Sequence, residues 1–469
     1  MSYTSPMPLE PLTAVSAVDG RYHDGSSALA DYFSEHALIS ARVRVECEYL
    51  MALSEAGVGM RALSNEETRT LRSFSAVSLE DARIVKKLER EGHDNVPATN
   101  HDVKAVEYFL RQKMQGTSLE DVSEWTHFAL TSEDVNSTAY GLLLSSFVER
   151  LLLPSLEGLR ATLEKLSQEH ASAAMLSRTH GQAASPTTFG KEMRVFESRL
   201  KRQMQQLSTR TILVKFGGAT GNWNAHMVAA PQVDWLSFAR QFVKRLDAGR
   251  RIPLELNEVT TQIEPHDTYA ELFDNARRAN SILIDLSQDI WRYISDGWIL
   301  QKPRAGEVGS SAMPHKVNPI DFENAEGNLG IANALFEQFS RKLPISRLQR
   351  DLSDSTVLRA IGTAFAHAVI GYASLIKGFA KISVNAQAMR EALAENPEVL
   401  AEAIQTVLRK EGIDAGYERL KELTRGKKVT LEDFATFIDG LAVNADVKKR
   451  LKALTPDSYI GLASDIAKG

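Results

Sequence analysis

The segment ILIDLSQDIWRYI, residues 282–294, carries the pattern that decides the fold class. Apolar side chains recur every four residues, and two more widen the stripe: Ile282, Leu286, Ile290 and Ile294, then Leu283 and Trp291. Charged residues fall between these positions. Because residues four apart lie on one face of an α-helix, the pattern predicts a helix whose apolar face packs against a core.

The same helical period continues on both sides of this segment. Leu142–Leu166 repeats it, and Pro154 predicts a kink or a break there because proline lacks a backbone donor. Phe365–Ile382 mixes small residues with large apolar ones, which allows helices to approach it closely on more than one side. The tail Ala386–Gly469 is again helical. Long helices in mid-chain predict an all-α fold around a central bundle that other subunits could complete.

The length of 469 residues exceeds one compact core, so two or three domains are expected. Polar residues interrupt the helical pattern near residues 118–123 and again near 382–385. These breaks predict an N-terminal helical domain (1–120), a central helical-bundle domain (121–383) and a C-terminal helical domain (384–469). No fixed-period repeat and no low-complexity linker was found.

The composition, 43% hydrophobic and 25% charged, is that of an ordinary globular protein. The net charge of -5 gives no general basic field, which argues against a nucleic-acid partner. A single cysteine, Cys47, excludes an intramolecular disulfide framework and a cysteine-cluster metal site, as expected in a reducing compartment. The first eleven residues lack a signal-peptide pattern, and no stretch approaches the apolar length that spans a bilayer. We therefore expect a soluble, cytoplasmic protein with no membrane contact.

Residues 309–319, GSSAMPHKVNP, concentrate reactive side chains on an irregular backbone. Lys316 supplies a compact positive charge, Asn318 a carboxamide donor, and Ser310 and Ser311 two hydroxyls. This set can hold a carboxylate and stabilise extra negative charge on it, and a serine beside such donors can act as a base or a nucleophile. A plain Gly/Pro turn with solvated polar residues is the alternative.

A second polar cluster surrounds His180 in residues 176–182, LSRTHGQ, where Gly181 marks a turn. An imidazole at such a turn can exchange a proton near neutral pH. A lone histidine is more often a surface residue or a satisfied core residue, so the local pattern leaves both interpretations open.

Two predicted helix starts also carry polar groups that are either functional or merely structural. Residues 100–102, NHD, precede a helix whose N-terminus can hold an anion, with Asp102 placed to orient His101. Asn100 as a simple N-cap is the alternative. Thr131 and Ser132 open another helix with hydroxyls and N–H groups, which are either a binding feature or only a cap.

A basic, hydroxyl-rich cluster lies near residue 350 and is suited to a phosphate, because arginine binds phosphate in a bidentate manner. Its members are Arg347, Arg350, Ser353, Ser355, Thr356 and Arg359. A solvated helix face is the alternative. The loop 216–222, FGGATGN, lacks the known nucleotide-binding glycine patterns, so we expect a tight turn there.

Taken together, these segments resemble the adenylosuccinate lyase family of bacteria, within the fumarase/aspartase superfamily. Residues 309–319 match the signature loop of the superfamily, and the arginine cluster with Arg21 and Tyr22 favours the family that binds a nucleotide phosphate. The further matching segments are 18–22 (VDGRY), 100–102, 131–132, 179–182 (THGQ), 261–267 (TQIEPHD), 349–359 (QRDLSDSTVLR) and 454–456 (LTP). Ala183, where the family commonly has proline, and a long segment before Asn100 depart from its pattern.

The resemblance implies a three-domain, all-helical fold in a homotetramer whose active sites draw residues from three subunits. It implies anti β-elimination of fumarate from adenylosuccinate, giving AMP, and from the ribotide SAICAR, giving AICAR, without a metal or a cofactor. Ser310 would be the general base and His180 the general acid. The substrate contacts that it implies are Arg21, Tyr22, Asn100, His101, Asp102, Thr131, Ser132, Gln262, Ser311, Lys316, Asn318, Asn324, Arg350, Ser355, Thr356, Val357, Leu358 and Arg359.

Two alternatives come from different classes. A related lyase that acts on argininosuccinate, malate or aspartate would keep the signature loop but would have no use for Arg350 and Arg359. A helical scaffold without activity would tolerate the loss of Ser310 and His180, and both residues are present.

Overall fold

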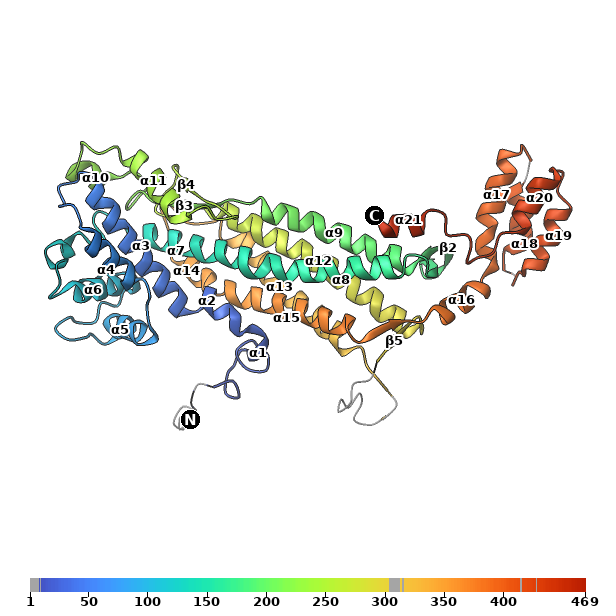
Figure 1. Cartoon of the computed structure of the whole chain (residues 1–469), viewed down its shortest axis with the longest axis horizontal. Coiled ribbons are helices and arrows are strands. Elements are labelled where there is room, and N and C mark those ends of the chain that lie inside the picture. Colours follow the sequence, from blue (N-terminus) through green and yellow to red (C-terminus); the bar gives the residue numbers. More distant parts are fainter. Residues whose placement is uncertain (1–7, 9, 303–312, 314–315, 414–415, 427) are drawn as a thin grey trace. The chain divides into compact units, whose positions relative to one another are not determined.

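The computed structural model describes residues 8, 10–302, 313, 316–413, 416–426 and 428–469 (Figure 1). The chain divides into two compact units, and each is built from three stretches of sequence. Unit 1 contains Met1–Leu156, Gln203–Ser281 and Gly327–Ala373, and unit 2 contains Glu157–Arg202, Ile282–Glu326 and Ser374–Gly469. The three-domain division expected from the sequence stays a prediction.

Helices dominate the described residues, as the sequence predicts. The long ones are α3 (Glu35–Glu55), α7 (Ser132–Phe147), α8 (Leu153–Glu169), α9 (Phe189–Ser208), α12 (Asp267–Ser295), α13 (Ile320–Lys342) and α15 (Ile361–Phe379). The shorter ones in the first 360 residues are α1 (His23–Ser26), α2 (Ala30–Phe33), α4 (Asn65–Phe74), α5 (Leu79–Arg90), α6 (Asp102–Met114), α10 (Asn224–Ala229), α11 (Trp235–Asp247) and α14 (Ser353–Leu358). The C-terminal ones are α16 (Ala386–Ala394), α17 (Ala401–Lys410), α18 (Gly416–Thr424), α19 (Leu431–Asp439), α20 (Ala445–Lys452) and α21 (Ala463–Lys468). Single turns of other helix types are η1 (Ser27–Leu29), η2 (Glu120–Trp125), η3 (Val148–Leu152) and η4 (Pro397–Leu400).

Short strand pairs join the helices, and the sequence analysis predicted none of them. The strands are β1 (Ala174–Thr179), β2 (Gln182–Thr188), β3 (Ile212–Lys215), β4 (Leu254–Asn257), β5 (Ile299–Gln301) and β6 (Ile382–Val384). β1 and β2 form an antiparallel hairpin, β3 and β4 pair in parallel, and β5 and β6 pair antiparallel. Runs of three to seven residues are too short to show a two-residue period against the helical background.

The segment that opened the sequence analysis lies in α12 and faces the core, as predicted. Ile282, Leu283, Leu286 and Ile290 are buried. Trp291 differs from the prediction, because it is 44% exposed and its Nε1 donates to Glu323 Oε1 at 3.1 Å. Successive residues point about 100° apart around a helix, so the residue after Ile290 turns away from the core.

The predicted break at Pro154 takes the form of a π-turn. α7 ends at Phe147, η3 is one π-helical turn, and α8 begins at Leu153, whose N–H donates to Val148 O five residues back. Pro154, the second residue of α8, lacks the backbone N–H that would donate to the preceding turn. The π-turn before it accommodates this missing donor, so the helical run continues past the proline.

Two helical runs, Ser132–Glu169 and Ser353–Phe379, are long and apolar enough to cross a bilayer, with mean hydropathies of 1.2 and 1.3. The expectation that no stretch approaches that length is therefore wrong. The large apolar residues of these runs, together with alanine, keep the mean hydropathy high. More than half of the most apolar 18-residue window of each run is buried inside the protein, as in the core helix of a soluble protein, so this is weak evidence for a membrane span.

Each unit has its own core. In unit 1 an aromatic cluster joins several helices, with ring centroids 4.5 Å apart for Phe147 and Phe365 and 4.8 Å apart for Phe336 and Phe365. In unit 2 the long helices are cross-linked by polar pairs, such as Arg160 with Glu197 at 2.8 Å. The C-terminal helices add a separate apolar cluster, made of Leu400, Ile404, Leu408, Leu420, Val429, Phe434, Ile438, Leu441, Val447 and Leu451.

Candidate functional site

The predicted site residues occur in both units. Unit 1 contains Arg21, Tyr22, Asn100, His101, Asp102, Thr131, Ser132, Gln262, Arg350, Ser355, Thr356, Val357, Leu358 and Arg359. Unit 2 contains His180, Lys316, Asn318 and Asn324. Ser310 and Ser311 lie outside the described residues.

His180 lies at the tip of the β1–β2 hairpin, so the predicted turn is confirmed. His180 and Gly181 form a two-residue connection with φ of 53° and 77°, the left-handed backbone that a type I′ turn needs. Gly181 adopts it freely, whereas an imidazole-bearing residue does so at a cost. The turn keeps the His180 side chain exposed, so a ligand can reach it.

The described residues at the end of the signature loop, 316–319, lead into α13. The Lys316 side chain is exposed, and its N–H donates to Met313 O at 3.0 Å. Gln301 Nε2 donates to Val317 O at 2.7 Å, which holds this segment next to β5. Asn324, one turn into α13, accepts a hydrogen bond from Ser374 Oγ at 2.7 Å, so its side chain is already positioned within unit 2.

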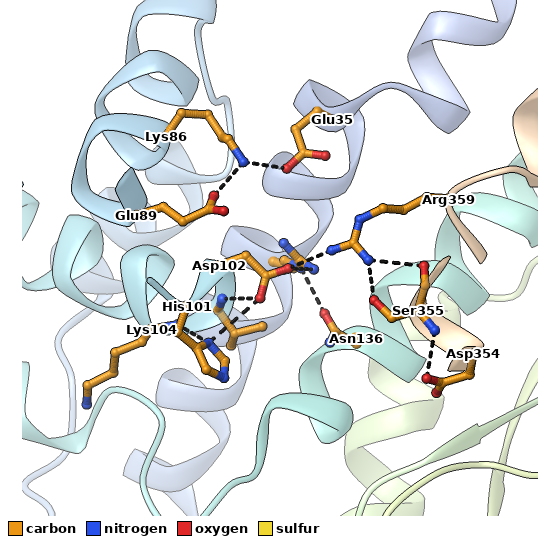
Figure 2. A network of polar contacts seen from close by, with 12 residues as sticks. Glu35, Lys86, Glu89, His101, Asp102, Lys104, Asn136, Asp354, Ser355 and Arg359 are labelled. Carbon is orange, nitrogen blue, oxygen red and sulfur yellow. Dashed lines mark hydrogen bonds and ion pairs between the residues drawn. The ribbon is translucent and has the colours of Figure 1, made fainter. Parts of the chain in front are cut away.

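In unit 1 a polar network centres on Asp102 at the start of α6 (Figure 2). Asp102 Oδ2 pairs with Arg42 Nη2 at 2.7 Å and with Arg359 Nη2 at 3.3 Å. Asp102 Oδ1 accepts from Val103 N at 2.9 Å. Burial raises the pKa of Asp102, but the charge and hydrogen bond of Arg42, the Val103 N–H and the charge of Arg359 outweigh it, so the pKa is lowered.

The cap of α6 differs from the prediction. His101, and not Asn100, is the N-cap residue, and its Nδ1 accepts from Lys104 N at 3.3 Å. In the neutral ring the proton therefore sits on Nε2, which leaves that atom as a donor. Asp102 does not orient His101 by a hydrogen bond, because its Oδ1 is 3.7 Å from His101 Nδ1. Asn100 adopts a left-handed φ of 48° before the cap.

A second arm of the network reaches α7 and the arginine cluster. Arg42 Nε donates to Asn136 Oδ1 at 2.8 Å, and Asn136 Nδ2 donates to Glu133 Oε1 at 2.7 Å. The same Glu133 oxygen pairs with Arg350 Nη2 at 2.9 Å. Arg350 Nε lies 3.5 Å from Asp354 Oδ2. Three arginines thus face three carboxylates, and the cluster is close to neutral.

The three arginines differ in exposure, and this separates their roles. The Arg42 and Arg350 side chains are 2% and 13% exposed, whereas that of Arg359 is 47% exposed. Arg359 Nη1 also donates to Ser355 O at 3.0 Å and to Ser355 Oγ. Of these three arginines, Arg359 is therefore the one that can reach a ligand. Leu358 is buried, so any ligand contact from it would have to come from the backbone.

The α7 N-terminus is organised by Asp134, which is fully buried. Its Oδ2 accepts from Thr131 N at 2.8 Å, and its Oδ1 accepts from Lys215 Nζ and from Gly217 N, both at 2.7 Å. The tight turn predicted at 216–222 is confirmed, and its N–H groups bind this protein carboxylate. Thr131 and Ser132 are held by a buried ion pair beneath them.

Two further predicted segments are held by hydrogen bonds to main-chain carbonyl groups. Gln262 N donates to Gln349 O at 3.3 Å, which joins the 261–267 segment to the arginine cluster. Arg21 and Tyr22 directly precede α1, where Ser26 Oγ donates to Val18 O at 2.8 Å and shapes the turn.

Glu264, two residues after Gln262, is a buried carboxylate of a different kind. It accepts from Asn257 Nδ2 at 3.1 Å and from His266 N at 2.5 Å. Burial raises its pKa to about 7, because these two hydrogen bonds only partly offset the loss of water.

Sequence reasoning missed Arg42, Asn136, Glu133 and Lys215 as supports of the site. The available signal was a charged residue inside an apolar helical or strand pattern, as for Arg42 in α3 and Lys215 in β3. A buried charge requires a partner, so each such residue points to an ion pair whose other member the sequence does not identify.

Comparison with known proteins defines the class. The Lyase family model matches residues 20–333, and the model named Adenylosuccinate lyase C-terminal matches residues 346–460. Among solved structures, a fumarate lyase from Mesorhizobium sp. BNC1 has a TM-score of 0.73 at 19% identity, covering 94% of this chain and 96% of that one. The 3-carboxy-cis,cis-muconate lactonizing enzyme from Pseudomonas putida has a TM-score of 0.69 at 20% identity, covering 94% and 95%. The fold is therefore the all-α fold of the fumarase/aspartase superfamily of lyases.

Relatives of higher sequence identity show which family within this superfamily the chain belongs to. The adenylosuccinate lyases of Vibrio cholerae and Dictyostelium discoideum are 49% and 48% identical to this chain, covering 98% and 99% of it and 99% and 100% of their own lengths. That of Escherichia coli K12 is 48% identical, covering 97% of this chain and 98% of its own. The chain belongs to the adenylosuccinate lyase family.

Proposed function

We propose that this protein eliminates fumarate from adenylosuccinate, giving AMP, and from SAICAR, giving AICAR. The observation that carries the proposal is the half-exposed Arg359, which is bonded to Ser355 and lies beside Asp102 in a chain with full-length similarity to adenylosuccinate lyases. An arginine of this kind suits the phosphate of a nucleotide, and a lyase acting on argininosuccinate, malate or aspartate has no phosphate to bind.

The elimination needs one proton removed and one supplied. A proton on the carbon next to a carboxylate is weakly acidic, so the negative charge must be spread onto that carboxylate and held there. We assign proton removal to Ser310 and stabilisation of the charge to Lys316 and Asn318. His180 donates a proton to the departing nitrogen while the C–N bond breaks and the C=C bond of fumarate forms.

The remaining residues bind and orient the substrate. Thr131 and Ser132 offer hydroxyls at the α7 N-terminus for a substrate carboxylate. Arg21, Tyr22, Ser355 and Arg359 hold the phosphate and ribose. Arg359 exchanges Asp102 for the phosphate, and Arg42 keeps the Asp102 carboxylate neutralised meanwhile. His101 and Gln262 serve as substrate contacts.

We further propose a cytoplasmic homotetramer with active sites shared between subunits. The family resemblance supports this assembly, and the exposure of His180 suits a shared site. Mixing the Ser310→Ala and His180→Ala variants under subunit exchange tests it. If the two residues of one site come from different subunits, mixed oligomers contain some intact sites and regain activity, whereas a site within one subunit regains none.

The activity is tested by a mass-resolved assay of the purified protein with adenylosuccinate, with argininosuccinate and malate as controls. Fumarate and AMP from adenylosuccinate alone support the proposal. Activity on a control only would keep the superfamily and reject the nucleotide. In this assay His180→Ala and Ser310→Ala should each lose at least about 100-fold in kcat, because each removes a proton-transfer group. Near-normal turnover by a folded variant would reject that residue's role.

A further inference from the structure

A cavity of about 350 Å³ in unit 1 is lined by none of the residues assigned above. It is lined by residues of α3 and α7 together with Ser75 and Arg250. Its floor is apolar, with Leu142 and Leu143 from α7. This volume is at the lower end of the range for small-molecule sites. The cavity shares no lining residue with the network around Asp102.

Two arginines, Arg44 and Arg250, line this cavity without a carboxylate partner. Neither forms an ion pair with any acidic residue in the part of the chain that the structure describes. Arg250 Nη1 donates to Ser146 Oγ at 2.6 Å, and its buried Nε has no hydrogen-bond partner among the described residues. Asp31, also in the lining, is the one carboxylate among the lining residues.

The two positive charges repel each other. Burial lowers the pKa of Arg250, and the charges of Arg44 and Arg150 lower it further, against weaker opposing effects of Asp247 and Glu149. This direction means that the site disfavours the cation, although a guanidinium stays protonated at any ordinary pH. An anion between the two arginines would remove the repulsion and would accept the unused Nε–H bond.

The other polar groups suit an oxyanion. Ser146 Oγ already accepts from Arg250, so its own hydrogen is free to be donated to a ligand. Ser75 adds a further hydroxyl to the lining, whereas Ser40 Oγ already donates to His36 O at 2.8 Å. His36 Nε2 donates to Val77 O at 2.9 Å in the neutral ring, so His36 offers a ligand no further donor. Two guanidinium groups and a hydroxyl match the planar and bidentate recognition of phosphate by arginine.

We propose that this cavity binds a phosphate group at Arg44 and Arg250, as a second anion site separate from the substrate site. The shared chemistry is that of inorganic phosphate and of the phosphate of a nucleoside monophosphate. The cavity has room for a phosphate with a few further atoms against the apolar floor. The inference does not depend on the proposed lyase activity.

The test measures phosphate binding by calorimetry on the full-length protein in the Arg359→Met background, which removes the proposed phosphate ligand of the substrate site. We expect phosphate to bind this variant, and Arg44→Met or Arg250→Met added to it to weaken binding at least about tenfold. Arg240→Met is the matched control, because Arg240 is exposed and paired with Glu258 at 2.5 Å. It should change the affinity less than about twofold.

Each further outcome decides the proposal. Arg44 makes no hydrogen bond or ion pair among the described residues, so Arg44→Met is expected to fold even where Arg250→Met does not. Unchanged phosphate affinity in Arg44→Met, or no binding to the Arg359→Met background, would overturn the site. Competition by AMP for the same site identifies the nucleotide as the source of the phosphate. Binding of phosphate without competition by AMP supports the site and identifies inorganic phosphate.

Discussion

Two carboxylates in the candidate substrate site, Asp102 and Glu264, show opposite electrostatics. Asp102 is flanked by Arg42 and Arg359, and its pKa is lowered. Glu264 is held by an amide and a backbone N–H with no cation beside it, and its pKa is raised to about 7. Burial opposes the charge at both positions. The comparison teaches that arginine partners can outweigh burial, as they do at Asp102. They do not at Glu133, whose pKa burial raises despite its pair with Arg350.

Arg42→Met removes the buried arginine partner of Asp102 and should have the largest effect on the free energy of unfolding. It leaves Asp102 and Asn136 without their buried donor, so we expect a loss of about 3 kcal/mol in the free energy of unfolding. Denaturant unfolding measures this. Arg42→Lys, which keeps the charge but not both hydrogen bonds, should lose about 1 kcal/mol. Equal losses in the two variants would show that shape, and not charge, is what Arg42 contributes.

The second prediction concerns Glu264 and the way in which the stability of the protein depends on pH. Its folded pKa of about 7 lies above the ordinary value of 4.5, so the folded state binds more protons between these two values. Stability should therefore fall as pH rises from about 4.5 to 7, by on the order of 3 kcal/mol for this group.

Glu264→Gln should remove that slope and be more stable than the unsubstituted protein at pH 8. Thermal unfolding across this pH range measures the slope. Glu255→Gln, which removes an exposed carboxylate on β4, is the control and should keep it. A slope that persists unchanged in Glu264→Gln would assign the pH dependence to another group.

The exposed partner of Asp102 gives the smallest effect on stability. Arg359→Met removes a half-exposed ion pair and should cost less than about 1 kcal/mol of unfolding free energy. If Arg359 binds the substrate phosphate, KM for adenylosuccinate should rise at least about tenfold with a smaller change in kcat. Arg240→Met, which removes an exposed ion pair outside the cluster, is the control. An unchanged KM in Arg359→Met would place the phosphate elsewhere.

Much of the fold class was readable from residues close in sequence, whereas the membership of the site stays a prediction. The four-residue period of α12 predicted a core helix, and the glycine after His180 predicted the turn that exposes it. The strands were missed because each is shorter than the window in which a two-residue period is visible. Trp291 was placed on the wrong face because a wide apolar stripe does not show where the core ends.

The sequence by itself determined the helical class, the turns and which residues carry reactive groups, because these depend on neighbours a few positions apart. Only the tertiary structure decided the electrostatics. Asp102 meets Arg42 across 60 residues and Arg359 across 257, and Asp134 meets Lys215 across 81. Such pairs form only when packing brings distant segments together. For this physical reason the charge on each buried group, and the arginine that stays available to a ligand, follow from the fold and not from the local pattern.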